Sequence, residues 1–250
     1  MTSLSKMLSV LKLFSPDLLV IEVDAISNVL GLSRATAYRY VKALCDAGLL
    51  VKQDGGYSLG PRIIELDWMM RQYDPLIING REVLSELSHK TGLAVFISVF
   101  FDGHIINTHI ESPLQDFNFI FGRGRPMPLF RGAQSKVLVS YQKGRRLKKL
   151  YDDYIADSEE YQYSWKEFSR ITRAIRKDGY CVTQDELNSG LTGLAAPIIK
   201  SEGEELVGSI AAVGPTESFE LLRRETVVEY VIEAGQKIAA KMSAGSKVTE

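Results

Sequence analysis

The stretch from residue 21 to residue 60 is IEVDAISNVLGLSRATAYRYVKALCDAGLLVKQDGGYSLG. Gly31 marks the end of one helical segment, because glycine adopts the left-handed conformation there without a Cβ penalty. Ser33 is a favourable N-cap for the next helix. Two short strands then flank the sequence DGG at residues 54–56, which is typical of hairpin turns that need positive φ. This order of helix, turn, helix and hairpin predicts a winged helix-turn-helix, whose second helix is shaped to enter a DNA major groove.

The second helix of this motif, expected over residues 33–47, has one apolar side and one polar side. Ala37, Val41 and Leu44 follow the i, i+4, i+7 spacing of a single helix face. A lone basic residue on a helix is more often solvated surface, so the prediction depends on the joint pattern of cap, turn and exposed cations. With one lysine of the hairpin added, the expected DNA contacts are Arg34, Tyr38, Arg39, Lys42 and Lys52.

The composition limits the classes of protein to consider. The chain has 250 residues, 45% of them hydrophobic, which is enough for one or two domains with sizeable cores. The net charge is −1, with +2 in residues 1–62 and −3 in the remainder. This distribution fits a DNA-binding domain with a few well-placed cations and does not fit a generic polycationic binder. The sequence has neither a secretory signal nor a membrane-length apolar stretch, so we expect a cytoplasmic protein that does not bind membranes.

The residues that usually carry catalysis are few and scattered. Cys45 and Cys181 are far apart in the sequence and do not suggest a disulfide framework. His104 and His109 lie five positions apart on one predicted strand, where their side chains would face opposite sides. The sequence shows no nucleophile-base motif, metal-ligand cluster or phosphate-binding loop. We therefore expect no enzyme activity, no metal and no cofactor.

The sequence divides into a DNA-binding domain over residues 1–61, a linker helix over 62–74, a larger domain over 75–242 and a flexible tail over 243–250. In the first domain, helices are expected over residues 3–14, 22–30 and 33–47. The linker segment is apolar around much of its circumference and includes Trp68, Met69 and Met70. It is interpreted either as a dimer seam or as an ordinary linker helix, and the sequence favours neither.

The larger domain has a mixed pattern. Helices are expected over residues 76–90, 132–141, 145–154, 165–178 and 221–242. Strands are expected over residues 94–101, 104–111, 118–121, 180–183, 193–200 and 206–213, with a loop over 122–128. Antiparallel strands flanked by helices predict an α+β domain of the kind that senses small molecules.

Several motifs together identify a family resemblance. They are GLSRATAYRYVKALCDAGLL at 31–50, YSLG at 57–60, PMPL-x-x-x-A-x-S-K at 126–136, GYCVTQDE-x-x-x-G at 179–190, LAAPI at 194–198 and VGP at 213–215. In this order and spacing they resemble the IclR-type family of bacterial transcription regulators over roughly residues 4–240. The resemblance implies an N-terminal winged helix-turn-helix joined by a linker helix to a GAF/profilin-like effector-binding domain. It also implies operator DNA as a partner and assembly as a homodimer or a dimer of dimers. The residues that match the DNA-contacting positions of the family's recognition helix are Ser33, Arg34, Thr36, Tyr38, Arg39 and Lys42.

The resemblance further implies a pocket for a small-molecule effector. In the family, backbone amides of the loop matching Gly132 and Ala133 contribute to the pocket, together with polar side chains at four later positions. Those positions are Thr183, Gly193, Ala211 and Val213 here, with Asp185 and Glu186 close to the first. Because most of the polar groups are replaced, the sequence favours an aromatic or apolar carboxylate over a small oxo-acid, or else no effector.

Two further features near this predicted pocket have alternative interpretations. Ser135 and Lys136 begin a predicted helix, whose free amides either bind a carboxylate or are simply capped. Five phenylalanines either belong to the core or form an apolar pocket wall: Phe96, Phe100, Phe117, Phe119 and Phe121.

The sequence thus predicts a DNA-binding transcription regulator that senses a small metabolite and controls catabolic genes. The alternative is a dimeric DNA-binding protein whose second domain serves assembly only. Neither the effector, the operator nor the choice between repression and activation follows from the sequence.

Overall fold

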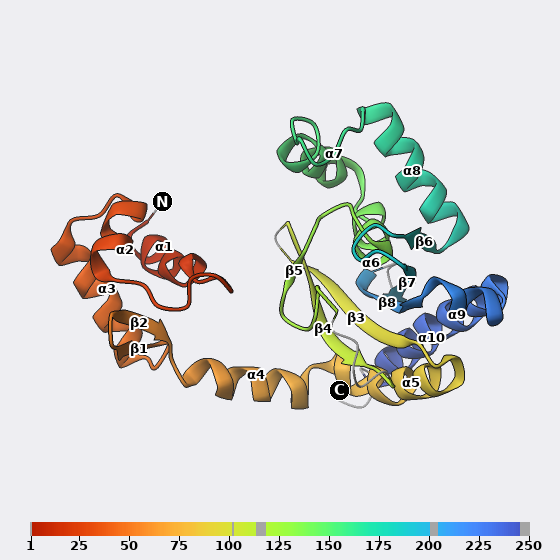
Figure 1. Cartoon of the computed structure of the whole chain (residues 1–250), viewed down its shortest axis with the longest axis horizontal. Helices are drawn as coiled ribbons and strands as arrows, with labels where there is room; N and C mark the ends of the chain where they lie inside the picture. The colour runs from red at the N-terminus through yellow and green to blue at the C-terminus, as the bar shows by residue number, and fades with distance from the viewer. Residues whose placement is uncertain (1, 102, 114–118, 201–204, 246–250) are drawn as a thin grey trace. The chain divides into compact units, whose positions relative to one another are not determined.

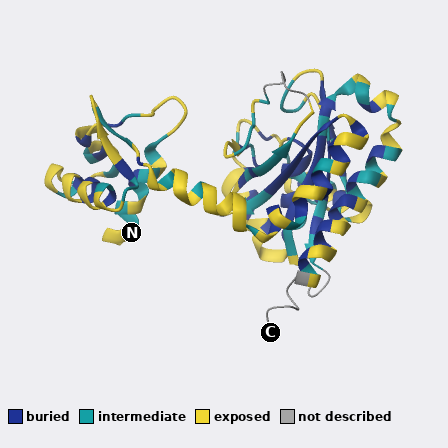
Figure 2. Ribbon diagram, turned by 90° about the horizontal axis from the view of Figure 1, so that it is seen from below, coloured by how far each residue is buried: buried dark blue, intermediate teal, exposed yellow. Residues whose placement is uncertain are grey.

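The computed structural model describes residues 2–101, 103–113, 119–200 and 205–245, which form two compact units. Unit 1 spans Met1–Asp74 and unit 2 spans Pro75–Glu250 (Figure 1). Each unit has its own set of buried apolar side chains. Figure 2 shows the buried residues of unit 2 concentrated along its sheet and on the helix faces that cover it.

Unit 1 is a small helical domain with a hairpin. Its elements are α1 (Ser3–Ser9), the 3₁₀ turn η1 (Val10–Leu13), α2 (Val23–Leu30), α3 (Arg34–Asp46), β1 (Leu50–Gln53), β2 (Gly56–Leu59) and α4 (Arg62–Tyr73). The prediction of one helix over 3–14 was therefore too long. The α-helix ends at Ser9 and its continuation tightens to 3₁₀ geometry, which is frequent at helix ends.

The local signals in unit 1 act as the sequence predicts. Gly31 ends α2 with a φ of 60°, and the Ser33 side chain caps α3 by accepting a hydrogen bond from the Thr36 amide. Ala37 and Val41 point into the core together with Ile26 of α2. The hairpin is antiparallel and is tied to the residues before α2 by backbone hydrogen bonds between Ile21 and Tyr57. The winged helix-turn-helix prediction is confirmed.

Unit 2 is built on a six-stranded antiparallel sheet in the order β5-β4-β3-β8-β7-β6. The strands are β3 (Ala94–Phe101), β4 (His104–Glu111), β5 (Pro126–Met127), β6 (Cys181–Gln184), β7 (Leu191–Lys200) and β8 (Glu205–Pro215). The two longest strands, β7 and β8, pair along almost their whole lengths. At the centre of the sheet β3 pairs with β8, so two segments that are far apart in the sequence lie side by side.

Helices cover both faces of this sheet (Figure 1). The helices are α5 (Pro75–Thr91), α6 (Ala133–Ser140), α7 (Gly144–Tyr154), α8 (Trp165–Asp178), α9 (Thr216–Leu221) and α10 (Arg224–Gly245). Side chains on β7 alternate between the faces, as the two-residue period of a strand requires. Leu194 and Ala196 pack against α5 and α10, whereas Ala195 packs against α6 on the other side. The α+β fold class is confirmed.

Three predicted elements of unit 2 differ in the structure. Residues 119–121 of the predicted strand 118–121 lie outside the strands, in a segment that turns at 120–121, and residue 118 is outside the described residues. Residues 126–127, expected in a loop, pair with β4 as the short strand β5. The closing helix expected over 221–242 is two helices, α9 and α10. They are separated at Arg223, whose φ of 60° is incompatible with a continuous helix.

Candidate functional site

The polar side of α3 presents the predicted DNA-contacting residues at the surface of unit 1. Arg34, Tyr38, Arg39 and Lys42 are exposed, and Ser33 is exposed at the N-cap. Thr36 is half-buried, with its hydroxyl 2.9 Å from that of Ser33. The opposite side of the helix is buried in the core, so the exposed side is available to a partner.

The wing lies beside this helix and completes the surface. Lys52 of β1 shares one groove with Arg34 and Tyr38, and a second with Arg39 and Lys42. The two grooves share Tyr38 and Lys52, so five of the seven predicted DNA contacts line adjoining grooves: Arg34, Tyr38, Arg39, Lys42 and Lys52. A wing lysine next to a recognition helix is well placed to contact a phosphate.

An acidic neighbour, which the sequence analysis did not single out, restrains one of these cations. Arg34 Nε lies 2.9 Å from Asp24 Oδ1 on α2, and both side chains are largely exposed. Its guanidinium also lies over the Tyr38 ring at 5.8 Å. Because an exposed ion pair contributes little stability, its main effect is to orient Arg34. The i+10 relation between Asp24 and Arg34 gives no signal in the sequence.

Replacing Arg39 with alanine should remove about 1–3 kcal/mol of discrimination between operator and mutated operator, provided that this residue bonds a guanine edge. The measurement is DNA binding to operator variants changed one base pair at a time. Arg145→Ala, an exposed arginine of α7 in unit 2, is the matched control and should change nothing. Full affinity and selectivity in a folded Arg39→Ala variant would contradict this role.

Replacing Lys52 with alanine should weaken binding to every DNA sequence about equally. It should also reduce the slope of log affinity against log salt by about 1, the value for one lost phosphate contact. The slope of log affinity against log salt is measured for operator and random DNA. Lys149→Ala, exposed on α7, should leave both slopes unchanged. A loss confined to one base position would instead assign Lys52 to base recognition.

In unit 2, a small cavity of about 40 Å³ lies between the sheet and the N-terminal end of α6. Gly132, Thr183, Gly193 and Val213, four of the seven residues predicted to bind an effector, line it. β6, β7 and β8 bring the last three together, because Thr183 pairs with Gly193 and Gly193 pairs with Val213.

The other three predicted effector residues are not in the cavity wall. Ala133 and Ala211 are completely buried and belong to the apolar cluster that joins α6 to the sheet. Ser135 is also completely buried, and its hydroxyl has no hydrogen-bond partner among the described residues. Ala133 and Ala211 were expected from the family resemblance and Ser135 from the start of a predicted helix, whereas the packing of α6 against the sheet decides which side chains reach the cavity.

Aromatic and apolar side chains form much of the cavity wall. Phe96, Phe119 and Phe121 line it with Met127 and Val213. Phe96 and Phe119 make an edge-to-face contact at 5.1 Å.

The remaining two phenylalanines of that group are not part of this wall. Phe100 lines a different groove, beside Arg146. Phe117 lies outside the described residues. The hypothesis of a pocket wall therefore applies to three of the five phenylalanines.

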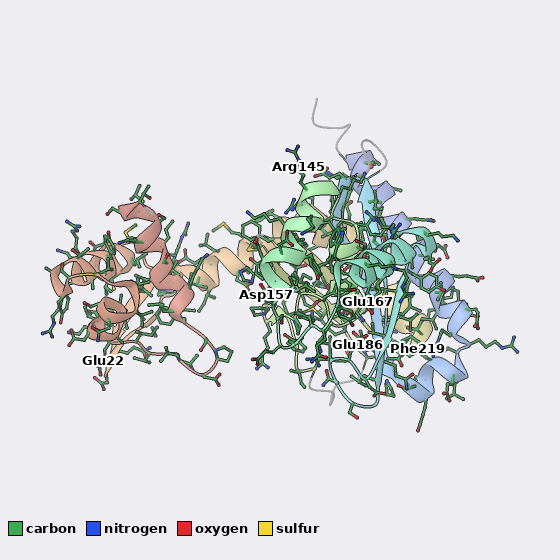
Figure 3. All side chains as sticks on the ribbon, turned by 90° about the horizontal axis from the view of Figure 1, so that it is seen from above. Glu22, Arg145, Asp157, Glu167, Glu186 and Phe219 are labelled. Carbon is green, nitrogen blue, oxygen red and sulfur yellow. The ribbon has the colours of Figure 1, made fainter. Side chains whose placement is uncertain are left out.

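A carboxylate of the protein itself occupies the polar end of the cavity. The Gly132 amide donates a hydrogen bond of 2.9 Å to Glu186 Oε2, and the Lys136 ammonium forms an ion pair with Oε1. Both side chains are largely buried, with 12% of Lys136 and 29% of Glu186 exposed. Glu186 is labelled in Figure 3. The sequence predicts Glu186 close to the pocket but does not predict this contact.

Two polar side chains at the cavity have no hydrogen-bond partner among the residues that the structure describes. Gln134 is 4% exposed and Thr183 is 8% exposed, and both line the cavity. Buried polar groups are usually hydrogen-bonded. These two groups are therefore available to a molecule in the cavity.

The cysteines are placed unfavourably for nucleophilic chemistry. Burial raises the pKa of the Cys181 thiol to about 12, so it stays protonated at neutral pH. Burial and the neighbouring Asp46 raise the pKa of Cys45 as well. Within the described part of the chain, no group of three or more His, Cys, Asp or Glu side chains could hold a metal ion. The described helices are all too short or too polar to cross a membrane.

Two family models match the chain. The model for "Bacterial transcriptional regulator IclR C-terminal" matches residues 72–240, and the model for the "IclR helix-turn-helix domain" matches residues 3–54. Among curated proteins, the HTH-type transcriptional regulator KdgR of Escherichia coli (strain K12) is 24% identical over 89% of this chain and 86% of its own. The Pca regulon regulatory protein of Pseudomonas putida is 22% identical over 82% of this chain and 72% of its own.

Solved structures share the fold. A putative IclR transcriptional regulator from Silicibacter sp. TM1040 gives a TM-score of 0.79 at 20% identity, with 96% of each chain covered. An IclR homolog from Microbacterium hydrocarbonoxydans, complexed with 4-hydroxybenzoate, gives a TM-score of 0.73 at 19% identity over 97% of this chain and 100% of that one.

Proposed function

The chain belongs to the IclR family of bacterial transcriptional regulators and is a DNA-binding regulator, and we propose that a small carboxylate bound in unit 2 controls its affinity for operator DNA. In this proposal α3 contacts base edges and the wing contacts phosphates. The regulated genes are catabolic, the protein acts in the cytoplasm where bacterial DNA lies, and it catalyses no reaction.

The observation that carries the effector proposal is the combination of groups at the cavity. The Gly132 amide and the Lys136 ammonium form an anion-binding end next to a wall of phenylalanines. Such a site matches a mono-anionic metabolite with an aromatic or apolar body. The relative that binds 4-hydroxybenzoate, an aromatic carboxylate, supports the same ligand class.

We also propose that the protein acts as a homodimer or a dimer of dimers. A single recognition helix contacts only a few base pairs, so two copies related by a two-fold axis would contact two half-sites. The exposed apolar side chains of α4 support this proposal, because they offer a surface to a second copy.

A second candidate function is a dimeric DNA-binding protein whose unit 2 serves assembly only. The position of Glu186 favours it, since the anion-binding groups already have a partner. A specific ligand distinguishes the two, because it stabilises the protein by RT ln(1 + [L]/Kd), or about 2.7 kcal/mol at 100-fold Kd.

The test is titration calorimetry of the full-length protein with aromatic carboxylates such as 4-hydroxybenzoate and with glyoxylate and pyruvate. The aromatic acids should bind more tightly, because the polar atoms of a small oxo-acid would lack partners at the apolar wall. Tighter binding of glyoxylate or pyruvate would contradict the proposed ligand class. Absence of binding by either class, with operator binding intact, would favour the assembly-only function.

Gly193 offers a matched pair of variants for the location of the site. A Cβ at this position would lie 3.6 Å from Thr183 Oγ1 and 3.7 Å from Val213 Cγ2, which are ordinary contacts. Gly193→Ala should therefore fold normally and still bind ligand. Gly193→Leu should fill the cavity and abolish binding. Equal binding by both variants would place the ligand elsewhere.

A further inference from the structure

We infer that the carboxylate of Glu186 is a built-in occupant of the effector's anion position, so that an effector binds by displacing it. This inference rests on the proposed function, because it concerns the same cavity. It adds a regulatory element to that site: the effector exchanges one carboxylate for another and releases the chain segment that carries Glu186.

The contacts of Glu186 are those expected of a bound carboxylate. Its two oxygens have different partners, the Gly132 amide for Oε2 and the Lys136 ammonium for Oε1. Charge-assisted hydrogen bonds of this kind are roughly twice as strong as neutral ones. Arg131 holds the backbone of the same residue, because its Nε donates to the Glu186 carbonyl oxygen at 3.1 Å. Glu186 therefore bonds three groups around the start of α6: the Arg131 side chain, the Gly132 amide and the Lys136 ammonium.

The cavity is too small for an effector while Glu186 stays in place. Its volume of about 40 Å³ is far below the ~300–1,000 Å³ of typical ligand pockets. It exceeds the ~10–15 Å³ that one water molecule needs, so water fits but an aromatic acid does not. Binding of a molecule of that size must therefore move part of the wall.

The segment that follows β6 is the part of the wall that an effector would move. Residues 185–190 form the turn between β6 and β7 and contribute Glu186, Leu187 and Asn188 to the cavity lining. Leu187 covers Gly132 so closely that a Cβ there would lie 2.5 Å from Leu187 Cδ1. Loss of the Glu186 contacts would allow Leu187 to move away from Gly132 and would expose the N-terminus of α6.

The unpartnered side chains in the wall independently indicate a larger occupant. Gln134 and Thr183 are more than nine-tenths buried and line the cavity, yet neither has a hydrogen-bond partner among the described residues. Glu186 satisfies the anion-binding groups but leaves these two groups unused. The expected effector is thus a monocarboxylate whose apolar body carries a further hydrogen-bonding group. A second carboxylate would be repelled by the displaced Glu186.

Formate tests the exchange without knowledge of the natural effector. In Glu186→Ala, the Gly132 amide and the Lys136 ammonium lose their partner, and formate supplies a carboxylate of the missing size. Sodium formate should raise the melting temperature of unit 2 in Glu186→Ala more than sodium chloride does, and should have no such effect on the wild type. Glu160→Ala is the matched control, because Glu160 pairs with Arg131 at 3.1 Å without contacting Gly132. Equal effects of formate and chloride on Glu186→Ala would overturn the inference.

Titration of Glu186→Gln gives the second readout, since this variant keeps the side-chain size and loses the charge. Any carboxylate that binds the wild type should bind this variant about 10- to 100-fold more tightly, the range for hydrogen bonds to charged groups. An uncharged analogue such as 4-hydroxybenzyl alcohol should bind Glu186→Gln no more tightly than it binds the wild type. Unchanged carboxylate affinity would overturn the inference while leaving the proposed function intact. If no aromatic acid binds either protein, the proposed ligand class fails and the formate experiment alone decides the inference.

Discussion

Replacing Leu66 and Met70 together with glutamate is expected to convert the assembled protein to monomers and to weaken operator binding by about 10²- to 10⁴-fold, the usual gain from linking two binding sites. The two residues lie on α4, whose apolar side chains are exposed in the single chain. Four negative charges in a two-fold interface would repel one another across a surface that would otherwise be dry.

The positions follow from the geometry of α4. With about 3.6 residues per turn, Leu66, Met69, Met70 and Tyr73 follow the i, i+3, i+4, i+7 spacing of one stripe, and all four are exposed. Ile64 and Trp68 lie on the other side of the helix, although they are also exposed. Trp68 is adjacent to Met69 and Met70 in the sequence, but the helix places it on a different side from these two residues.

Ile64→Glu/Trp68→Glu is the matched control, because it places the same charges at the same spacing on the other side. Mass measurement at micromolar concentration should give monomers for the first variant only, with intact circular dichroism in both. Operator titrations should show the corresponding loss. Dissociation of the control alone would place the interface on the opposite side, and a monomeric wild type would refute the proposed assembly.

Replacing Phe130 with alanine is expected to destabilise unit 2 by about 3–5 kcal/mol, the range for deletion of a buried aromatic side chain. Phe130 is completely buried, and its ring contacts Phe168 at 4.6 Å and Tyr163 at 5.7 Å. Loss of the ring leaves a cavity that these neighbours can fill only in part. For a unit of this size, the corresponding fall in melting temperature is about 6–20 °C.

Calorimetry can test this expectation because the two units are separate compact bodies. Multi-domain proteins need not unfold in one transition, so the transition of unit 2 should shift while that of unit 1 remains. Phe101→Ala is the matched control, since Phe101 is exposed and its truncation should cost little. A loss below about 1 kcal/mol in Phe130→Ala would show that the ring contributes less than a typical buried aromatic side chain.

The sequence by itself determined the elements whose signals are local. Gly31 ends α2 and Ser33 caps α3, while the turn at residues 54–56 closes the wing. Each signal acts through backbone groups within one or two helical turns, so nearby residues suffice to specify the structure. The apolar spacing of Ala37 and Val41 likewise fixes which side of α3 remains exposed. The fold class and the surface proposed for DNA followed from these patterns.

Only the tertiary structure decided what occupies the effector cavity. Sequence spacing alone could not separate Gly193 and Val213, which line it, from Ala133 and Ala211, which are buried beside it. Nor could it place Glu186, which meets the Gly132 amide across 54 positions of sequence. Contacts of that range depend on strand order and on the packing of α6 against the sheet. These properties arise from many weak interactions across the whole unit, and no short segment contains them.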